Sequence, residues 1–247
     1  MRKTLLIITA VMLVIGCSKP INDETLIDVD GLKYHPETKE LYSGDVFKNY
    51  LGGKTGYEGS YKNGKQDGKW TYWWENGQKG AEETYKDGKE EGLWTVWYEN
   101  GQKKQEGTYK DGELDGLVIK WHENGQKESE RTYKDGKPTG KWTVWYENGE
   151  KRYEGTFKNG ELDGKRIGWF ENGEKRYEGT FKNGEKDGLS TNWYENGQKE
   201  AEGTYKNGRK DGLFTTWYDN GQKNFEVTYK DGKQIDYKAW DIDGNKR

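Results

Sequence analysis

The chain has 247 residues but only one cysteine, two histidines and three prolines. A single cysteine excludes an intramolecular disulfide framework, and together with two histidines it leaves no Cys/His spacing suited to zinc. The sequence also lacks a glycine-rich phosphate loop between a strand and a helix, and it has no G-x-S-x-G motif. We therefore expect a non-catalytic protein that uses no metal and no cofactor.

Aliphatic side chains are also scarce, because Leu, Ile and Val become few beyond the first 20 residues. This scarcity excludes a conventional two-layer core. A mean hydropathy of −1.32, a charged content of 34% and 36 glycines are by themselves typical of disorder. Twelve tryptophans and 18 tyrosines are not, since disordered segments are poor in aromatic residues. We expect an ordered but thin protein in which cross-strand aromatic pairs take the place of a core.

Long runs of one charge are absent as well. The net charge is −3, and lysine and glutamate are interspersed along the chain. No basic stripe is therefore visible that could neutralise a row of phosphates. We expect no nucleic-acid partner.

The first 16 residues are typical of a bacterial secretory leader. Residues 1–4 are basic, and the apolar run over residues 5–15 is too short to span a bilayer. The run leads into Val14-Ile15-Gly16-Cys17, which resembles the lipobox of bacterial lipoproteins. The resemblance implies a signal peptide over residues 1–16 and an acylated Cys17 that anchors the chain in a lipid membrane. The alternative is an ordinary leader with a buried, unmodified cysteine.

The next segment, residues 17–31, is polar and rich in aspartate, and we interpret it as a lipidated flexible tether. Ser18 follows the cysteine where an aspartate would retain a lipoprotein in the inner membrane. By resemblance to that sorting rule, the outer membrane is favoured if the host has two membranes. We expect a lipid-anchored protein of the bacterial cell envelope.

A tandem repeat with a period of 24 residues follows and sets the fold. One turn signal, Glu/Asp-Asn-Gly, has its glycine at Gly77, Gly101, Gly125, Gly149, Gly173, Gly197 and Gly221. A second signal, Asn/Asp-Gly, has its glycine at Gly64, Gly88, Gly112, Gly136, Gly160, Gly184, Gly208 and Gly232. Such pairs between aromatic runs predict two-residue type I′ turns, with positive φ at both central residues. The sequence thus predicts an all-β fold, an elongated, twisted, single-layer antiparallel meander of β-hairpins over residues 32–247.

The even period keeps each repeat position on one face of this sheet. With a two-residue turn at Asn100-Gly101, Trp97 faces Lys104 on one side and Tyr98 faces Lys103 on the other. The first face then carries a column of tryptophans, namely Trp73, Trp97, Trp121, Trp145, Trp169, Trp193 and Trp217.

These seven tryptophans are the candidate binding residues. One interpretation is structural, with the rings holding neighbouring strands together between lysine and glutamine stems. The other is functional, with a row of aromatic platforms at intervals of about 10 Å on which sugars or a partner chain would stack. The two interpretations are compatible.

Other candidate sites are weaker. His122 occupies a repeat position that otherwise holds an aromatic ring, so we interpret it as a substituted aromatic. Residues 28–31 and 241–244 resemble the start of a calcium loop but lack the glutamate at its twelfth position, and turn chemistry explains their Asp-Gly pairs equally well.

Repeats of the form W-Y-E-N-G-Q-K-x-x-E-G-T-Y-K-D-G-K-x-D-G resemble the variant MORN repeat of bacteria over about residues 41–247. The resemblance implies a scaffold that binds proteins or lipid headgroups, and some bacterial proteins of this kind are labelled antitoxins of the YwqK family. With the tryptophan column, it favours a membrane-anchored binding module for an unidentified protein or glycan. The alternative is an antitoxin or immunity protein of a toxin–antitoxin pair. Charged edge strands favour a monomer.

Overall fold

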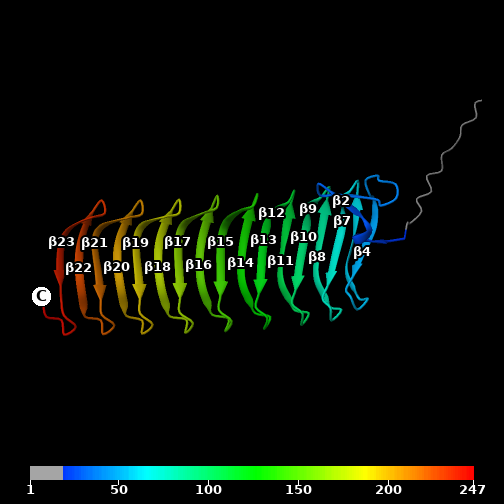
Figure 1. The fold of residues 1–247 in the computed structure, drawn as a ribbon. Coiled ribbons are helices and arrows are strands. Elements are labelled where there is room, and N and C mark those ends of the chain that lie inside the picture. Colours follow the sequence, from blue (N-terminus) through cyan, green and yellow to red (C-terminus); the bar gives the residue numbers. More distant parts are fainter. Residues whose placement is uncertain (1–18) are drawn as a thin grey trace, which may run out of the picture.

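The computed structural model describes residues 19–247, which form one long, open sheet a single layer thick (Figure 1). From β4 to β23 the chain runs as an antiparallel meander, as the period predicts. The short β6, β9 and β12 each pair with the same strand as the β7, β10 or β13 that follows, so each is the first segment of an interrupted strand. The strands of this array are β4 (Gly44–Asn49), β5 (Thr55–Lys62), β6 (Lys65–Gln66), β7 (Gly68–Trp73), β8 (Lys79–Lys86), β9 (Lys89–Glu90), β10 (Gly92–Trp97), β11 (Lys103–Lys110), β12 (Glu113–Leu114), β13 (Gly116–Trp121), β14 (Lys127–Lys134), β15 (Lys137–Trp145), β16 (Lys151–Lys158), β17 (Glu161–Trp169), β18 (Lys175–Lys182), β19 (Glu185–Trp193), β20 (Lys199–Lys206), β21 (Arg209–Trp217), β22 (Lys223–Lys230) and β23 (Lys233–Ala239).

The Asp-Gly and Asn-Gly pairs of the second signal form the predicted type I′ turns. At Asp111-Gly112 both residues have positive φ, 52° and 86°, and the flanking Lys110 and Glu113 pair across the turn. This geometry matches the twist of the two strands that it joins.

The Glu/Asp-Asn-Gly turns differ from the prediction, because only their glycine has a positive φ. At Gly101, φ is 83°, its N–H donates to the Tyr98 carbonyl (2.9 Å), and the Tyr98 N–H donates to the Gln102 carbonyl (2.9 Å). The result is a three-residue loop with a glycine bulge. The Asn100 side chain supports it by accepting a hydrogen bond from the Gln102 N–H (2.9 Å).

This loop shifts the register that the sequence predicts next to it. Trp97 pairs with Lys103 rather than with Lys104. The two lysines therefore exchange faces, so that Lys103 joins the tryptophan side whereas Lys104 lies over the Tyr98 ring, 5.4 Å from its centre. The predicted pair of Tyr98 with Lys103 is wrong for the same reason, since Tyr98 bonds to Gln102 across the loop. Farther from the loop, Thr95 pairs with Glu106 and Trp94 with Gly107, as a two-residue turn would also place them.

The N-terminal end of the sheet is closed by a small cap. It consists of β1 (Ile21–Asn22), the 3₁₀ helix η1 (Asp23–Thr25), and the hairpin of β2 (Ile27–Val29) and β3 (Leu32–Tyr34). β1 pairs with β4 in parallel, so the sheet is antiparallel except at this edge. The main core cluster forms where the cap meets the sheet, and Leu26 of the cap is buried there with Tyr42, Val46 and Trp70.

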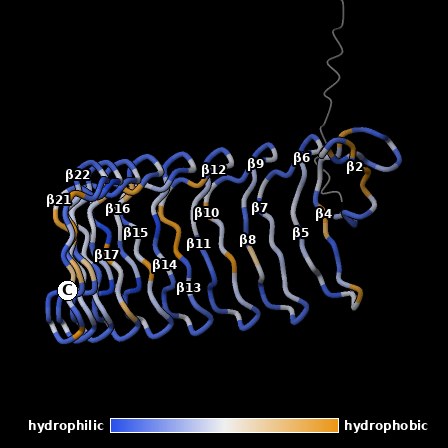
Figure 2. Tube along the Cα trace, turned by 60° about the vertical axis from the view of Figure 1, so that its left-hand side comes forward, coloured by the Kyte–Doolittle hydropathy of each residue, from blue (hydrophilic) through white to orange (hydrophobic). Residues whose placement is uncertain are grey.

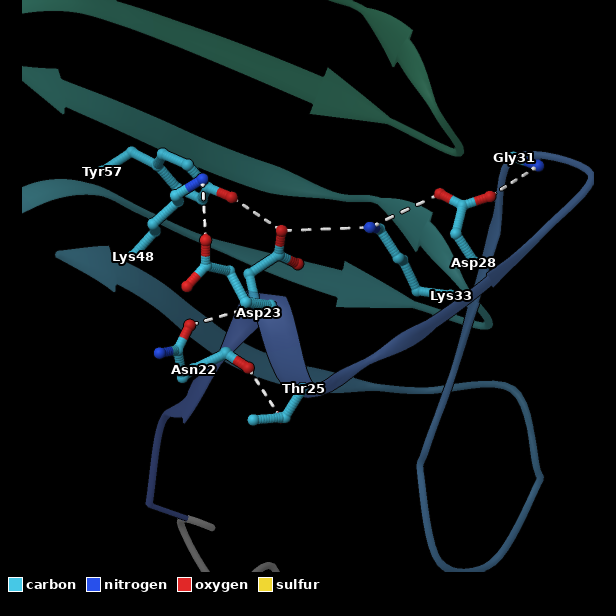
Figure 3. A network of polar contacts seen from close by, with 9 residues as sticks. Asn22, Asp23, Thr25, Asp28, Gly31, Lys33, Lys48 and Tyr57 are labelled. Atoms are coloured by element: carbon cyan, nitrogen blue, oxygen red, sulfur yellow. Dashed lines mark hydrogen bonds and ion pairs between the residues drawn. The ribbon is translucent and has the colours of Figure 1, made fainter. Parts of the chain in front are cut away.

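The predicted flexible tether over residues 17–31 is wrong for residues 21–29, which belong to this cap. Figure 3 shows the polar contacts that hold them. The Tyr57 hydroxyl donates to Asp23 Oδ2 (2.6 Å), and Lys33 Nζ lies 3.9 Å from the same carboxylate. Lys48 forms an ion pair with Glu24 (3.0 Å). Burial, followed by the bond to Asp23, raises the pKa of Tyr57 and keeps its phenol protonated.

Beyond the cap the sheet has little interior. Figure 2 shows hydrophilic turns along both long edges and hydrophobic residues scattered in the strands between them. Within residues 19–247, no helix is both long and apolar enough to span a membrane. The faces of the array are therefore its main chemical features.

Candidate binding faces

The tryptophan face is formed by the predicted column together with its cross-strand partners. In the repeat of β10 and β11 these are Leu93 with Thr108, Thr95 with Glu106, and Trp97 with Lys103. The structure places all seven predicted tryptophans at the same repeat position, and each is half-buried. The seven are Trp73, Trp97, Trp121, Trp145, Trp169, Trp193 and Trp217.

A lysine from the preceding repeat covers one side of most of these rings. Lys79 lies 6.0 Å from the centre of the Trp97 ring, and Lys175 lies 5.8 Å from that of Trp193. The same geometry recurs at Trp121, Trp169, Trp217 and Trp240. Such cation–π contacts connect one repeat to the next and limit the motion of the indole rings.

Each of these lysines is also paired with a carboxylate. Lys103 donates to Glu106 (2.6 Å) and Lys175 to Glu178 (2.7 Å), and the pair recurs in every regular repeat. Where a lysine holds the repeat position of Leu93, a second ion pair forms, as between Lys165 and Glu178 (2.6 Å). The cations of this face are thus largely neutralised by the face itself.

Some glutamates are paired with two lysines each, and these pairs make the stability of the array depend on pH. Hydrogen bonds from Lys69 and Lys79 hold the pKa of Glu82 below its ordinary value of 4.5, and those from Lys165 and Lys175 do the same for Glu178. A lowered carboxylate pKa in the folded state means that the stabilisation is complete above pH 4.5 and is lost as the pH falls through the folded pKa.

We therefore expect the thermal midpoint to fall on acidification below pH 4.5, and to fall less in the double variant Glu82→Gln/Glu178→Gln. Each lysine–glutamate pair is expected to contribute at most about 1 kcal/mol to the free energy of unfolding, because the lysines are exposed. Thermal unfolding followed by circular dichroism at neutral and acidic pH measures it. Glu99→Gln/Glu147→Gln, which neutralises two exposed turn residues, is the control; an acid response reduced equally by this control would contradict the assignment.

The opposite side of the sheet, the tyrosine face, carries the aromatic rings Trp74, Tyr98, His122, Tyr146, Phe170, Tyr194 and Tyr218 at one repeat position. Most of them reach the backbone of the next repeat, as when the Tyr98 hydroxyl donates to the Trp121 carbonyl (2.7 Å) and that of Tyr146 to the Trp169 carbonyl (2.9 Å). His122 Nε2 lies 3.3 Å from the Trp145 carbonyl, in keeping with a substituted aromatic. This column joins consecutive repeats.

Two hollows interrupt the tyrosine face. The smaller, about 430 Å³, lies over Gly56 and Gly80 between Tyr50, Tyr72 and Trp74. The larger, about 1030 Å³, extends over β15 to β20 and is lined by aromatic rings and four cations, Arg152, Arg166, Arg176 and Lys186. We call the larger one the cationic groove. The repeat pattern and the net charge of the sequence do not predict this groove.

Cys17 and the signal peptide over residues 1–16 lie outside the described residues, so the lipid anchor stays a prediction. In the part of the chain that the structure describes, no three His, Cys, Asp or Glu side chains stand close enough to hold a metal ion. The two faces of the sheet are therefore the candidate binding surfaces.

Comparison with known families identifies the repeat. The model described as "MORN repeat variant" matches seven times, and together the matches cover more than half of the chain. Each match corresponds to one turn-to-turn unit of the sheet. The matched residues are 66–87, 90–111, 114–135, 138–159, 162–183, 186–207 and 210–231. No curated protein matches the chain.

Proposed function

The chain belongs to the MORN repeat variant family, and on this premise we propose that it is a non-catalytic binding module of the bacterial cell envelope. The repeats form an extended platform, the tryptophan face binds a protein or glycan partner, and an acylated Cys17 holds the platform at the membrane. If the host has two membranes, this is the outer one.

One observation carries the proposal. The tryptophan column is periodic, half-buried and held by lysines that are themselves paired with glutamates. Rings of this kind are ordered before a partner arrives, so little conformational entropy is lost on binding. Tryptophan is also the residue type most enriched among the dominant contacts of protein interfaces. A row of equivalent rings suits a partner that is itself extended or repetitive.

Replacing three consecutive rings tests the role of this face. We expect the full-length variant Trp97→Thr/Trp121→Thr/Trp145→Thr to lose at least about tenfold in the capture of envelope proteins and glycans that wild type retains, since central aromatic contacts are each worth about 2 kcal/mol or more. Affinity capture followed by mass spectrometry measures the loss, and circular dichroism checks that the strands remain.

The matched control is Leu93→Lys/Leu117→Lys, which alters exposed positions of the same face to the lysine found at Lys141 and Lys165. It is expected to retain the same partners as wild type. If the tryptophan variant also retained them all, the tryptophan face would not be the binding surface.

The anchor has its own test. Mass spectrometry of the mature N-terminus is expected to find an acylated Cys17 as the first residue. An unmodified cysteine, or cleavage elsewhere, would remove the anchor from the proposal. The antitoxin alternative stays a prediction that requires a linked toxin.

A further inference from the structure

The cations on the two faces of the sheet differ in whether a carboxylate lies close to them. On the tryptophan face, Lys151 and Lys175 are each paired with a glutamate within 2.9 Å. On the tyrosine face, the four cations of the cationic groove have no carboxylate within 4.0 Å anywhere in residues 19–247. The groove therefore holds four positive charges that no carboxylate of the described residues neutralises at ion-pair distance.

These four cations lie on aromatic rings instead. Arg166 is central, with its guanidinium carbon 5.1 Å from the centre of the Tyr153 ring and 5.4 Å from that of Tyr177. Arg152 lies over Tyr146 and Arg176 over Phe170, both at 5.6 Å. Lys186 lies between Tyr177 (5.3 Å) and Tyr205 (4.7 Å). The rings fix the direction of each cation without cancelling its charge.

The cations also repel one another. Burial, followed by repulsion from Arg166 and Lys210, lowers the pKa of Lys186. An anion bound between these groups would relieve this repulsion. In the folded protein the groove therefore holds positive charges that repel one another and that a bound anion would stabilise.

Small residues create the space for a ligand. Gly168 holds the position that Val96 and Val144 hold in earlier repeats, and this removes a side chain from the floor of the groove. The Tyr177 ring leans along its own strand over Gly179, and its hydroxyl occupies the space that a Cβ at this position would need. The hollow is therefore created by the small residues of these strands and is not a gap between loops.

Acidic residues limit the length of the positive stretch. The repeat position of Arg152 and Arg176 is occupied by Glu128 in the repeat before and by Glu200 in the repeat after. Glu195 and Glu200 line the C-terminal end of the groove. The four cations of the groove lie on the four strands β16 to β19, which span roughly 20 Å at about 4.8 Å per strand.

We propose that the cationic groove binds a glycan that carries carboxylate groups. Arginine forks pair with carboxylates through two parallel hydrogen bonds, and the flat C–H faces of sugar rings pack on aromatic rings such as Trp142 and Tyr194. A peptide fits less well, because the strands of the groove are interior and have no free backbone edge for strand addition. This inference rests on the proposed role as a binding module. It uses the tyrosine face, where Trp169 and Trp193 of the tryptophan column also line the groove.

The test measures binding of the full-length protein to polygalacturonate by titration calorimetry, with neutral dextran as the uncharged glycan. We expect wild type to bind polygalacturonate and not dextran. The variant Arg166→Ser/Lys186→Leu should weaken binding at least about tenfold, since two charge-assisted contacts are lost. Both substitutions install residues that other repeats already hold at these positions, Ser190 and Leu162.

Two further variants separate a specific groove from general charge. Lys141→Leu/Lys165→Leu removes the same charge from the tryptophan face of the same repeats and should change the affinity less than about twofold. Gly168→Val fills the floor, where a Cβ would make only ordinary contacts at 3.7 Å or more, and should weaken binding in a folded protein.

The proposal is overturned if wild type does not bind polygalacturonate, or if the tryptophan-face control weakens binding as much as the groove variant. Groove-dependent binding that is tighter to polyglutamate or to phosphatidylglycerol vesicles would assign the site to an acidic peptide or a lipid headgroup instead. These outcomes leave the capture experiment on the tryptophan face unaffected, so failure of the groove and failure of the proposed function are distinguishable.

Discussion

We expect Trp70→Ala to lower the free energy of unfolding by about 3–5 kcal/mol, the cost of truncating a large aromatic in a core. Trp70 is 2% exposed and contacts Tyr57, Tyr61 and Tyr85. Its ring lies directly on Gly59, and its indole N–H donates to the Ser60 carbonyl (3.2 Å). No second cluster in the described residues matches this one in burial of large side chains.

The loss should be local as well as large. Repeats contact mainly their neighbours, so the N-terminal cap is expected to detach while the distant strands β19 to β23 stay folded. Urea unfolding by circular dichroism measures the free energy, and amide hydrogen exchange locates the loss of protection.

Trp142→Ala is the matched control for Trp70→Ala. Trp142 holds the same repeat position but is only half-buried, and its indole N–H has no hydrogen-bond partner within the described residues. A smaller loss is expected, without detachment of the cap. Equal losses in the two variants, or a cap that keeps its exchange protection in Trp70→Ala, would contradict this account of the core.

The period of 24 predicted most of the fold, because an even period and the alternation of side chains in a strand keep each position on one face. It could not decide the local register. An Asn-Gly pair suits both a two-residue turn and a three-residue loop. The side-chain amide of Asn76 donates to the Glu99 carbonyl of the next repeat (2.8 Å), a contact that exists only once the repeats are stacked.

The cap was missed for a similar reason. Asp23 and Leu26 lie in a polar stretch with no periodicity, and their burial depends on Tyr57 and Trp70, which come 31 or more residues later in the chain. Local composition predicts a tether here, whereas long-range contacts order the segment.

The cationic groove was hidden by the register shift beside each glycine loop. Arg152 and Glu154 are two residues apart, as are Arg176 and Glu178, so strict alternation would place each pair on one face, where their charges cancel. The β-bulges at Arg152 and Arg176 instead put the two members of each pair on opposite faces. In the structure the glutamates turn to the tryptophan face and pair with lysines there, whereas the arginines remain on the tyrosine face. Charge must be summed by face, which requires the register.

Deleting one whole repeat, residues 164–187, is expected to leave a folded array that is one unit shorter. The deletion joins Asp163 to Gly188, which restores the Asp-Gly junction also found at Asp115-Gly116 and Asp211-Gly212. Every later strand keeps its direction and its face, so the strand signal per residue in circular dichroism should be unchanged and unfolding should remain a single transition at a lower midpoint. The deletion removes Arg166, Gly168 and Lys186, so binding of polygalacturonate should be lost.

The half-unit deletion of residues 164–175 is the contrasting variant, which is expected to disrupt the array. Removing one strand and one turn reverses the direction of every later strand, which exchanges the two rows of turns and moves later tryptophans to the opposite face. The tyrosine and lysine contacts between repeats are then broken at the junction, and two separate unfolding transitions or aggregation are expected. If both deletion variants showed the same unfolding transitions, the contacts between stacked repeats would not be the source of cooperative unfolding in the array. The whole-unit deletion is predicted to survive because the stacked contacts of β16 and β20 with their new neighbours repeat those they already make.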